Sequence, residues 1–118
     1  MPNPSEITLH QQSSLLEIAF DDGARYRFPY EFLRVHSPSA EVRGHGPGQE
    51  VLQVGKKNVR LLDVQPSGSY AIKLTFDDGH DTGLYTWDYL HGLGKYQDAL
   101  WHDYLRRLEE AGENRDPR

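Results

Sequence analysis

The chain lacks cysteine entirely: none of its 118 residues is one. Without thiols it forms no disulfide, no thiolate metal site and no cysteine nucleophile. It also has no apolar run that approaches the ~18 residues of a membrane-spanning helix. Its first ten residues, MPNPSEITLH, lack the basic start and apolar stretch of a signal peptide. We therefore expect a soluble, cytoplasmic protein with no membrane partner.

Positive charge is also in short supply. The chain carries 13 basic and 18 acidic residues, a formal net charge of −5. Nucleic-acid binding usually requires a basic field, so we expect no nucleic-acid partner. Two small basic groups, Lys56–Lys57–Arg60 and Arg106–Arg107, are typical of ordinary solvated surface.

The tetrapeptide Phe-Asp-Asp-Gly occurs twice, at residues 20–23 and 76–79. Each copy ends a segment of alternating apolar residues, 15–20 and 70–76, and alternation of period two is typical of a β-strand. Another extended segment follows each copy. Because Asp-Gly between two strands indicates a tight turn, we predict two hairpins and interpret the aspartates as turn residues.

The remaining segments alternate between short strands and loops. We expect a strand over 7–10, a polar turn over 11–14, a strand over 24–28, a short helix over 29–35, a Gly/Pro-rich loop over 36–51, a strand over 59–64, a turn over 65–69 and an extended segment over 82–86.

The C-terminal third has helical periodicity. Thr86 is a candidate N-cap of a short helix that we expect Gly92 and Gly94 to interrupt. A longer helix is predicted over 95–111, with Gly112 as its stop signal. Its apolar stripe of Tyr96, Leu100, Tyr104 and Leu108, flanked by Trp101 and Leu105, is suited to covering a sheet.

These elements predict an α+β fold, in which a mostly antiparallel sheet of hairpins packs against a C-terminal helix as a two-layer sandwich. We expect a single domain over 7–111, a flexible start over 1–6 and a disordered tail over 112–118.

Motifs for chemistry are sparse. The six histidines form neither the His-x-Asp nor the HExxH spacing, and Asp21–Asp22 and Asp77–Asp78–Asp81 lack the calcium-loop spacing. No GxSxG elbow occurs, and GHGPG at 44–48 is not a dinucleotide fingerprint. We therefore assign no catalytic and no cofactor-binding residue. The aromatic residues near the second hairpin and the long helix are more typical of core than of a ligand cage; they are Tyr85, Trp87, Tyr89 and Trp101.

Two stretches carry a family resemblance: RYRFPYEFLRVHSPSAEVRGHG at 25–46 and YAIKLTFDDGHDTGLYTWDYLHGL at 70–93. In this order and spacing they resemble the gamma-butyrobetaine hydroxylase-like N-terminal domain family, a family of unknown function, over about residues 7–95. The resemblance implies an α+β domain found alone in bacteria, fused to the catalytic domain of gamma-butyrobetaine and trimethyllysine dioxygenases, or attached to P-loop iron–sulfur carrier proteins. Oxygenase activity belongs to a separate domain and does not transfer with the fold.

In the dioxygenases, the resemblance also implies a structural zinc held by three cysteines and one histidine. Those positions fall here on Ser37, Ser39, Val42 and His80. A serine hydroxyl stays protonated near neutral pH and is a poor zinc ligand, and valine offers no donor. We therefore expect the zinc to be lost and no metal cofactor to be bound. Hydrogen bonds and packing should then hold the loop over 36–48, with His80 capping the turn or bonding loop backbone.

Three hypotheses for function remain open. The leading one is a small non-enzymatic module, monomeric, that binds another protein in a setting of iron–sulfur or oxygenase-related metabolism. The second is binding of a metal, iron or zinc, through His36, His45 and His80 with Asp78 or Asp81. The third is a small-ligand binder or unrecognised enzyme that uses the cleft between the 36–48 loop and the helix starting at Trp87.

Overall fold

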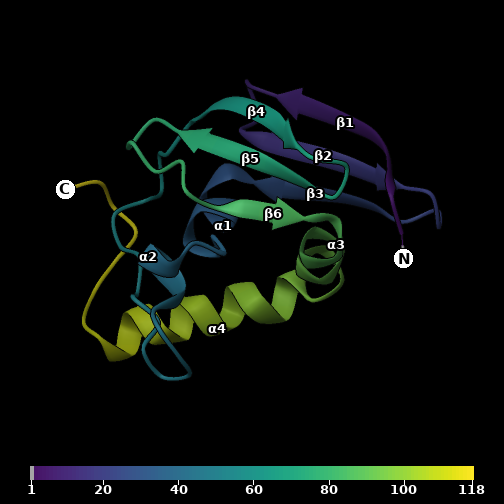
Figure 1. The fold of residues 1–118 in the computed structure, drawn as a ribbon. Helices are drawn as coiled ribbons and strands as arrows, with labels where there is room; N and C mark the ends of the chain where they lie inside the picture. The colour runs from purple at the N-terminus through teal and green to yellow at the C-terminus, as the bar shows by residue number, and fades with distance from the viewer. Residues whose placement is uncertain (1) are drawn as a thin grey trace.

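Two three-stranded antiparallel sheets and four helices make up residues 2–118, the part of the chain that our computed structural model describes (Figure 1). The predicted α+β class is confirmed. In chain order the elements are β1 (Pro4–His10), β2 (Leu15–Phe20), β3 (Arg25–Pro29), α1 (Tyr30–Val35), α2 (Ala40–Arg43), β4 (Leu61–Ser67), β5 (Ala71–Phe76), β6 (Leu84–Thr86), α3 (Trp87–Lys95) and α4 (Gln97–Glu110).

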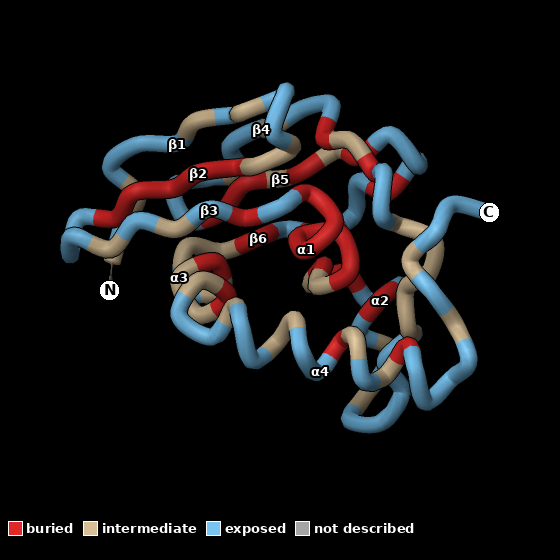
Figure 2. Tube along the Cα trace, turned by 180° about the vertical axis from the view of Figure 1, so that it is seen from behind, coloured by how far each residue is buried: buried red, intermediate tan, exposed pale blue. Residues whose placement is uncertain are grey.

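The two sheets have the strand orders β1-β2-β3 and β4-β5-β6, and both contribute to one apolar core. The central strands β2 and β5 are the most completely buried, together with α1 (Figure 2). Their alternating residues face this core as the sequence predicts; they are Leu16, Ile18 and Phe20 of β2 and Ile72, Leu74 and Phe76 of β5. Helices α1 and α3 add further side chains to the same core.

The two Phe-Asp-Asp-Gly turns have the same geometry. In each, the phenylalanine N–H donates to the carbonyl oxygen four residues on, at 2.8 and 3.0 Å, and the glycine has a left-handed φ of 91° and 88°. In each, the second aspartate accepts a hydrogen bond from the N–H two residues on, at 2.9 and 3.1 Å. The interpretation as turns is therefore correct for both copies.

Several boundaries differ from those predicted. Strand β1 begins at Pro4, inside the segment expected to be a flexible start. Strand β4 is shifted toward the C-terminus and includes Pro66, which we had placed in a turn. Strand β4 is an edge strand and pairs on one side with β5. An edge strand tolerates proline, because the residue has no N–H to donate and the open side of the strand has no neighbour that would accept one. Residues 36–51, predicted to be a loop, contain the single turn of helix α2.

Helix α3 begins as predicted and ends later. The Thr86 hydroxyl accepts from the N–H of Tyr89 at 3.1 Å, which makes Thr86 the N-cap. The helix then continues through both Gly92 and Gly94 to Lys95 instead of being interrupted by them. At Gly94 a Cβ atom would lie inside the van der Waals radius of the Tyr26 ring, so this glycine permits α3 to pack closely on β3.

Helix α4 uses its apolar stripe differently from the prediction. Tyr104 and Leu108 are buried against Val35 and the 52–54 segment, so this half of α4 covers α1 and a loop instead of a sheet. Tyr96 lies before the helix and is 56% exposed. The helix ends at Glu110, and Gly112, with a φ of 66°, follows the C-cap residue as the stop signal that the sequence indicates. None of the helices within residues 2–118 has the length and apolar character needed to cross a bilayer.

The C-terminal segment, which we expected to be disordered over 112–118, is held against the domain. The N–H groups of Gly55 and Lys57 donate to the carbonyls of Asn114 and Arg115, at 3.2 and 3.0 Å. The Arg115 guanidinium also makes a bidentate pair with Glu31, at 2.7 and 2.8 Å. Such a pair fixes geometry as well as charge, which explains why the tail is ordered here.

The two glycines of α3 provide a matched test of the packing. We expect Gly94→Ala to lower the free energy of unfolding by about 1–3 kcal/mol, because the added methyl group must displace the Tyr26 ring. Gly92→Ala meets open space and should raise it by up to about 1 kcal/mol through helix propensity. Urea unfolding of both variants measures the difference, and equal effects would contradict this account of Gly94.

Candidate functional site

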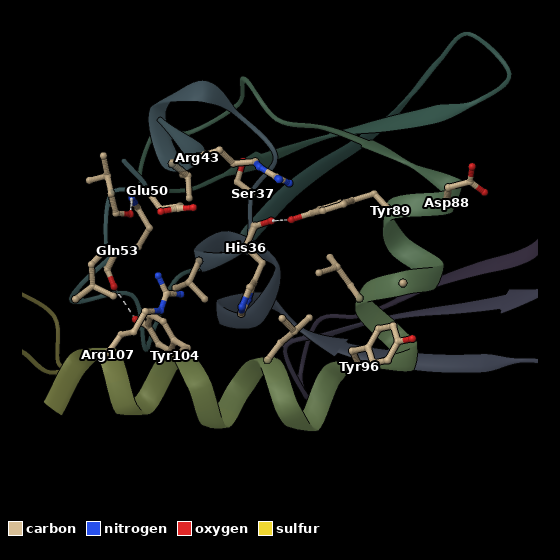
Figure 3. Close-up of a pocket in the computed structure, with 17 residues that line it drawn as sticks. His36, Ser37, Arg43, Glu50, Gln53, Asp88, Tyr89, Tyr96, Tyr104 and Arg107 are labelled. Atoms are coloured by element: carbon tan, nitrogen blue, oxygen red, sulfur yellow. Dashed lines mark hydrogen bonds between the residues drawn. The ribbon is translucent and has the colours of Figure 1, made fainter. Parts of the chain in front are cut away.

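A pocket of about 480 Å³ lies between the 35–53 segment and helices α3 and α4 (Figure 3). Its walls are mainly aliphatic and aromatic, with Leu52, Leu93 and Leu100 among the lining residues. Two further lining residues are large, apolar and exposed: Val51 is 54% exposed and Tyr96 is 56% exposed. The pocket therefore combines an apolar interior with apolar residues that reach the solvent.

Two tyrosine hydroxyls join the walls of the pocket. Tyr89 of α3 donates to the carbonyl of His36 at 2.6 Å, and Tyr104 of α4 donates to the carbonyl of Gln53 at 2.6 Å (Figure 3). Burial raises the pKa of both phenols, that of Tyr104 to about 12, so both remain protonated donors near neutral pH. These bonds fix the 36–53 segment across both helices.

His36 lies at the centre of the lining. Its Nδ1 donates to the carbonyl of Phe32 at 2.9 Å, and its ring packs on the Phe32 ring with centroids 4.4 Å apart. Burial lowers the pKa of this imidazole, and the nearby charge of Arg107 lowers it further. His36 is therefore a neutral group in the wall near pH 7.

The charged lining residues are two arginines and two carboxylates. Arg43, in the last turn of α2, lies over the Tyr89 ring with its guanidinium carbon 5.7 Å from the ring centroid. Arg107 comes from α4, Glu50 from the loop and Asp88 from the first turn of α3. Figure 3 shows the Asp88 carboxylate directed away from the pocket.

Behind this pocket, Ser37 and His80 form a buried hydrogen bond. Ser37 Oγ and His80 Nε2 are 2.8 Å apart, and Ser37 and His80 are 0% and 6% exposed. His80 Nδ1 lies 3.2 Å from the carboxylate of Glu41, which can only accept, so we place the imidazole proton on Nδ1 and let Ser37 donate to Nε2. Burial lowers the pKa of His80, which keeps the ring neutral.

A second pair strengthens the same junction. The Ser39 hydroxyl contacts Thr82 Oγ1 at 2.7 Å and accepts from the N–H of Glu41, which caps α2. The N–H of Ser39 in turn donates to Ser37 Oγ at 3.2 Å. The loop after α1 is thus joined to the segment after the second turn by two serine side chains.

Ser37, His80 and Glu41 have the connectivity of an acyl-transfer triad, but not its accessibility. Ser37 is fully buried, and Gly83 lies so close to its hydroxyl that a Cβ there would overlap it. A triad serine must reach a substrate carbonyl. We interpret this set as structural.

Asp78 of the second turn accepts hydrogen bonds from three groups. Its Oδ2 accepts from Arg34 at 2.8 Å and from Lys56 at 2.6 Å, and its Oδ1 caps the turn at His80. Burial raises the pKa of Asp78, but the hydrogen bonds from Lys56, from the His80 N–H and from Arg34 outweigh it and lower the pKa from 3.8 to about 2. Asp78 therefore closes the turn and also serves as a structural anion for Arg34 and Lys56.

A family model described as gamma-butyrobetaine hydroxylase-like, N-terminal, matches residues 7–91, which include both turns and the Ser37–His80 junction. The chain belongs to this family. The matched segment ends within α3, so the α4 wall of the pocket lies beyond it.

Several solved structures resemble the domain, among them the following three. Two, each described only as an NMR solution structure of a protein, are 56% and 49% identical; they match 100% and 99% of this chain and 93% and 87% of their own, with TM-scores of 0.86 and 0.85. A third, from Acidithiobacillus ferrooxidans, is described as a protein of unknown function of the DUF971 family. It is 37% identical over 78% of this chain and 92% of its own, with a TM-score of 0.66. No curated protein matches the chain.

The positions that the family resemblance assigned to zinc do come together in space. Ser37 and His80 are hydrogen-bonded, and the N–H of Ser39 donates to Ser37 Oγ. Val42 is 6% exposed, and its N–H donates to the carbonyl of Ser39. They do not fit the ion, because the only strong donor, His80 Nε2, is engaged by a serine hydroxyl and three sulfur ligands are absent. The His80 ring bonds a loop side chain, Ser37, whereas the prediction was that it would cap the turn or bond loop backbone.

The alternative metal ligands are dispersed. His36 is held by its own helix, His45 and Asp81 are exposed, and Asp78 is saturated by cations. Within residues 2–118 no cluster of three or more such side chains has the arrangement of a metal site.

Sequence reasoning missed several roles. Lys56 and Arg60, expected on solvated surface, bind Asp78 and Ser14, at 2.6 and 2.7 Å. Tyr89, expected in the core, lines the pocket, and Arg43 had not been singled out at all. One signal in the sequence pointed to this wall of the pocket: the adjacent apolar residues Val51 and Leu52, which follow a glycine- and proline-rich stretch.

The Ser37–His80 bond can be tested by truncation. We expect Ser37→Ala to lower the free energy of unfolding by about 1–3 kcal/mol, because it leaves a buried ring nitrogen without its donor. Ser13→Ala, at an exposed serine, should change it by no more than about 0.5 kcal/mol. EDTA should leave the Tm of the wild type unchanged; a clear fall in Tm would show that an ion, not this bond, holds the junction.

Asp78 predicts a defined loss of stability in acid. Its pKa is lower in the folded state, so its contribution, about 1–2 kcal/mol with solvent screening, is fully present above pH ~5 and is lost as pH falls toward ~2. Asp78→Asn should lack this part of the pH dependence and be less stable at pH 7. Asp81→Asn, at an exposed carboxylate, is the control and should follow the wild type. Parallel pH profiles for wild type and Asp78→Asn would contradict the prediction.

Proposed function

We propose that this domain binds a small amphipathic organic molecule in the pocket between the 35–53 segment and helices α3 and α4. The observation that carries the proposal is the pocket itself, about 480 Å³ with walls that are mainly aliphatic and aromatic. Ligand sites in proteins typically occupy roughly 300–1,000 Å³ and combine apolar walls with a few polar groups. The volume and lining of this pocket fall within that description.

The construction of the pocket supports the same proposal. The Tyr89 and Tyr104 hydroxyls tie the loop wall to the helical walls, so a ligand need not order the loop when it binds. A site that is already formed avoids part of the entropic cost of association. The buried junction of Ser37 and His80 supports the loop from behind.

A protein partner is the second candidate for the same site. Val51 and Tyr96 are large apolar residues left exposed beside the pocket, and clustered exposed apolar residues often mark interaction sites. In this candidate an apolar side chain of the partner enters the pocket. The cytoplasmic, iron–sulfur or oxygenase-related setting, and the monomeric state of the domain, remain part of the proposal in either case.

The small-molecule proposal is tested by NMR titration of the ¹⁵N-labelled domain with 1-octanol, a neutral amphiphile. We expect shifts confined to the pocket lining and saturation at millimolar concentration or below. Leu100→Gln should weaken binding about fivefold or more, because Leu100 lines the pocket and loses its apolar contact with the chain of the probe. Leu105→Gln, at another half-buried leucine of α4 outside the lining, is the matched control.

The outcome separates the two candidates. Shifts scattered over the surface, or equal effects of the two leucine variants, would refute the small-molecule site. If no amphiphile binds and Val51→Glu loses a partner protein that Leu62→Glu retains, the pocket serves protein binding. Leu62 is the control because it is similarly exposed, at 63%, and lies on β4 outside the lining.

A further inference from the structure

We infer that the ligand of this pocket carries a carboxylate that pairs with Arg43, with an apolar body against the leucines of the lining. The inference rests on the proposed small-molecule function and adds the charge of the head group. It depends on the arginines and carboxylates of the pocket wall and on which of them already have partners.

Arg43 is a cation without a counter-ion. Its guanidinium lies over the Tyr89 ring, 5.7 Å from the centroid, and no carboxylate of residues 2–118 is within 4 Å of it. By contrast, the arginines at positions 25, 34, 106 and 115 each pair with a carboxylate. Stacking on an aromatic face leaves the in-plane N–H groups of a guanidinium directed outward, and their fork matches a carboxylate.

Arg107 adds a second, loosely held positive charge. Its nearest carboxylate is Asp103, 3.4 Å from Nε, but Asp103 is held more closely by Arg106. Among residues 2–118, Arg107 Nε is the one buried side-chain nitrogen or oxygen without a hydrogen-bond partner. A buried donor without a partner is uncommon in folded proteins and indicates incomplete pairing of this group.

The acidic residues of the lining do not cancel these charges. Asp88 is directed away from the pocket (Figure 3) and lies in the first turn of α3, where the helix N-terminus favours a negative charge. Glu50 is then the one carboxylate left to oppose Arg43 and Arg107 in the described lining. His36 is neutral and does not change the balance, so the wall favours an anion over a cation.

The experiment compares three probes with the same eight-carbon chain: octanoate, 1-octanol and octylammonium, each titrated into ¹⁵N-labelled wild type at low salt. We expect octanoate to bind about tenfold tighter than the other two, as one charge-assisted pair in a partly apolar site allows. Arg43→Gln should remove this preference, so that octanoate binds no more tightly than 1-octanol. Arg43 is exposed, so the variant should fold, and its Tm verifies this.

Arg27→Gln is the matched control, because it removes the same charge from β3, outside the pocket lining. It should retain the preference for octanoate. Binding of 1-octanol without a preference for octanoate, or a preference that survives Arg43→Gln, would overturn the assignment of a carboxylate and leave the proposed function standing. If none of the three probes binds, both proposals are overturned.

Discussion

The hydrogen bond between Ser37 and His80 joins the two halves of the domain at the point where the pocket wall begins. One partner follows α1, and the other follows the second Phe-Asp-Asp-Gly turn, 43 residues later. Both are buried, so neither can exchange its partner for water, and loss of either side would leave an unsatisfied polar group in the interior. The loop that starts at Ser37 is therefore held by a protein contact at the positions where the family resemblance implied a metal ion.

The turn beside this bond has a second function in the architecture. Asp78 closes the turn locally and also binds Arg34 and Lys56, so one carboxylate connects β5, α1 and the segment before β4. The equivalent Asp22 of the first turn makes the same local bond, but it lies at the surface and pairs only with His91. The repeated tetrapeptide thus encodes the same turn twice. The second copy also has a structural role that the first lacks, because Arg34 and Lys56 bind its aspartate.

The pocket combines parts of different origin. Its loop wall and the first part of α3 lie in the segment matched by the family model, whereas Gly92 and Leu93 of α3 and all of α4 lie beyond residue 91. Tyr104, which closes the pocket from α4, reaches the carbonyl of Gln53 across 51 residues of sequence. Because part of this site lies beyond the matched segment, the family match alone does not account for it.

Local signals in the sequence identified the elements that depend on local physics. The alternation in β2 and β5, the positive-φ glycines of the turns, the Thr86 cap and the Gly112 stop are each decided within a few residues, and each was predicted correctly. The meeting of Ser37 with His80 was anticipated only through the family resemblance, since nothing in the two segments alone indicates that they touch.

What the sequence by itself determined was the α+β class, the two Phe-Asp-Asp-Gly turns with the strands that lead into them, and the absence of thiolate ligands. Only the tertiary structure shows why Gly94 stands inside helix α3. A larger residue there would collide with the ring of Tyr26, which belongs to β3. The tertiary structure likewise decided that Arg115 orders the tail through Glu31 and that Arg43 faces a pocket without a counter-ion. These outcomes depend on residues far apart in the chain, which only folding brings together.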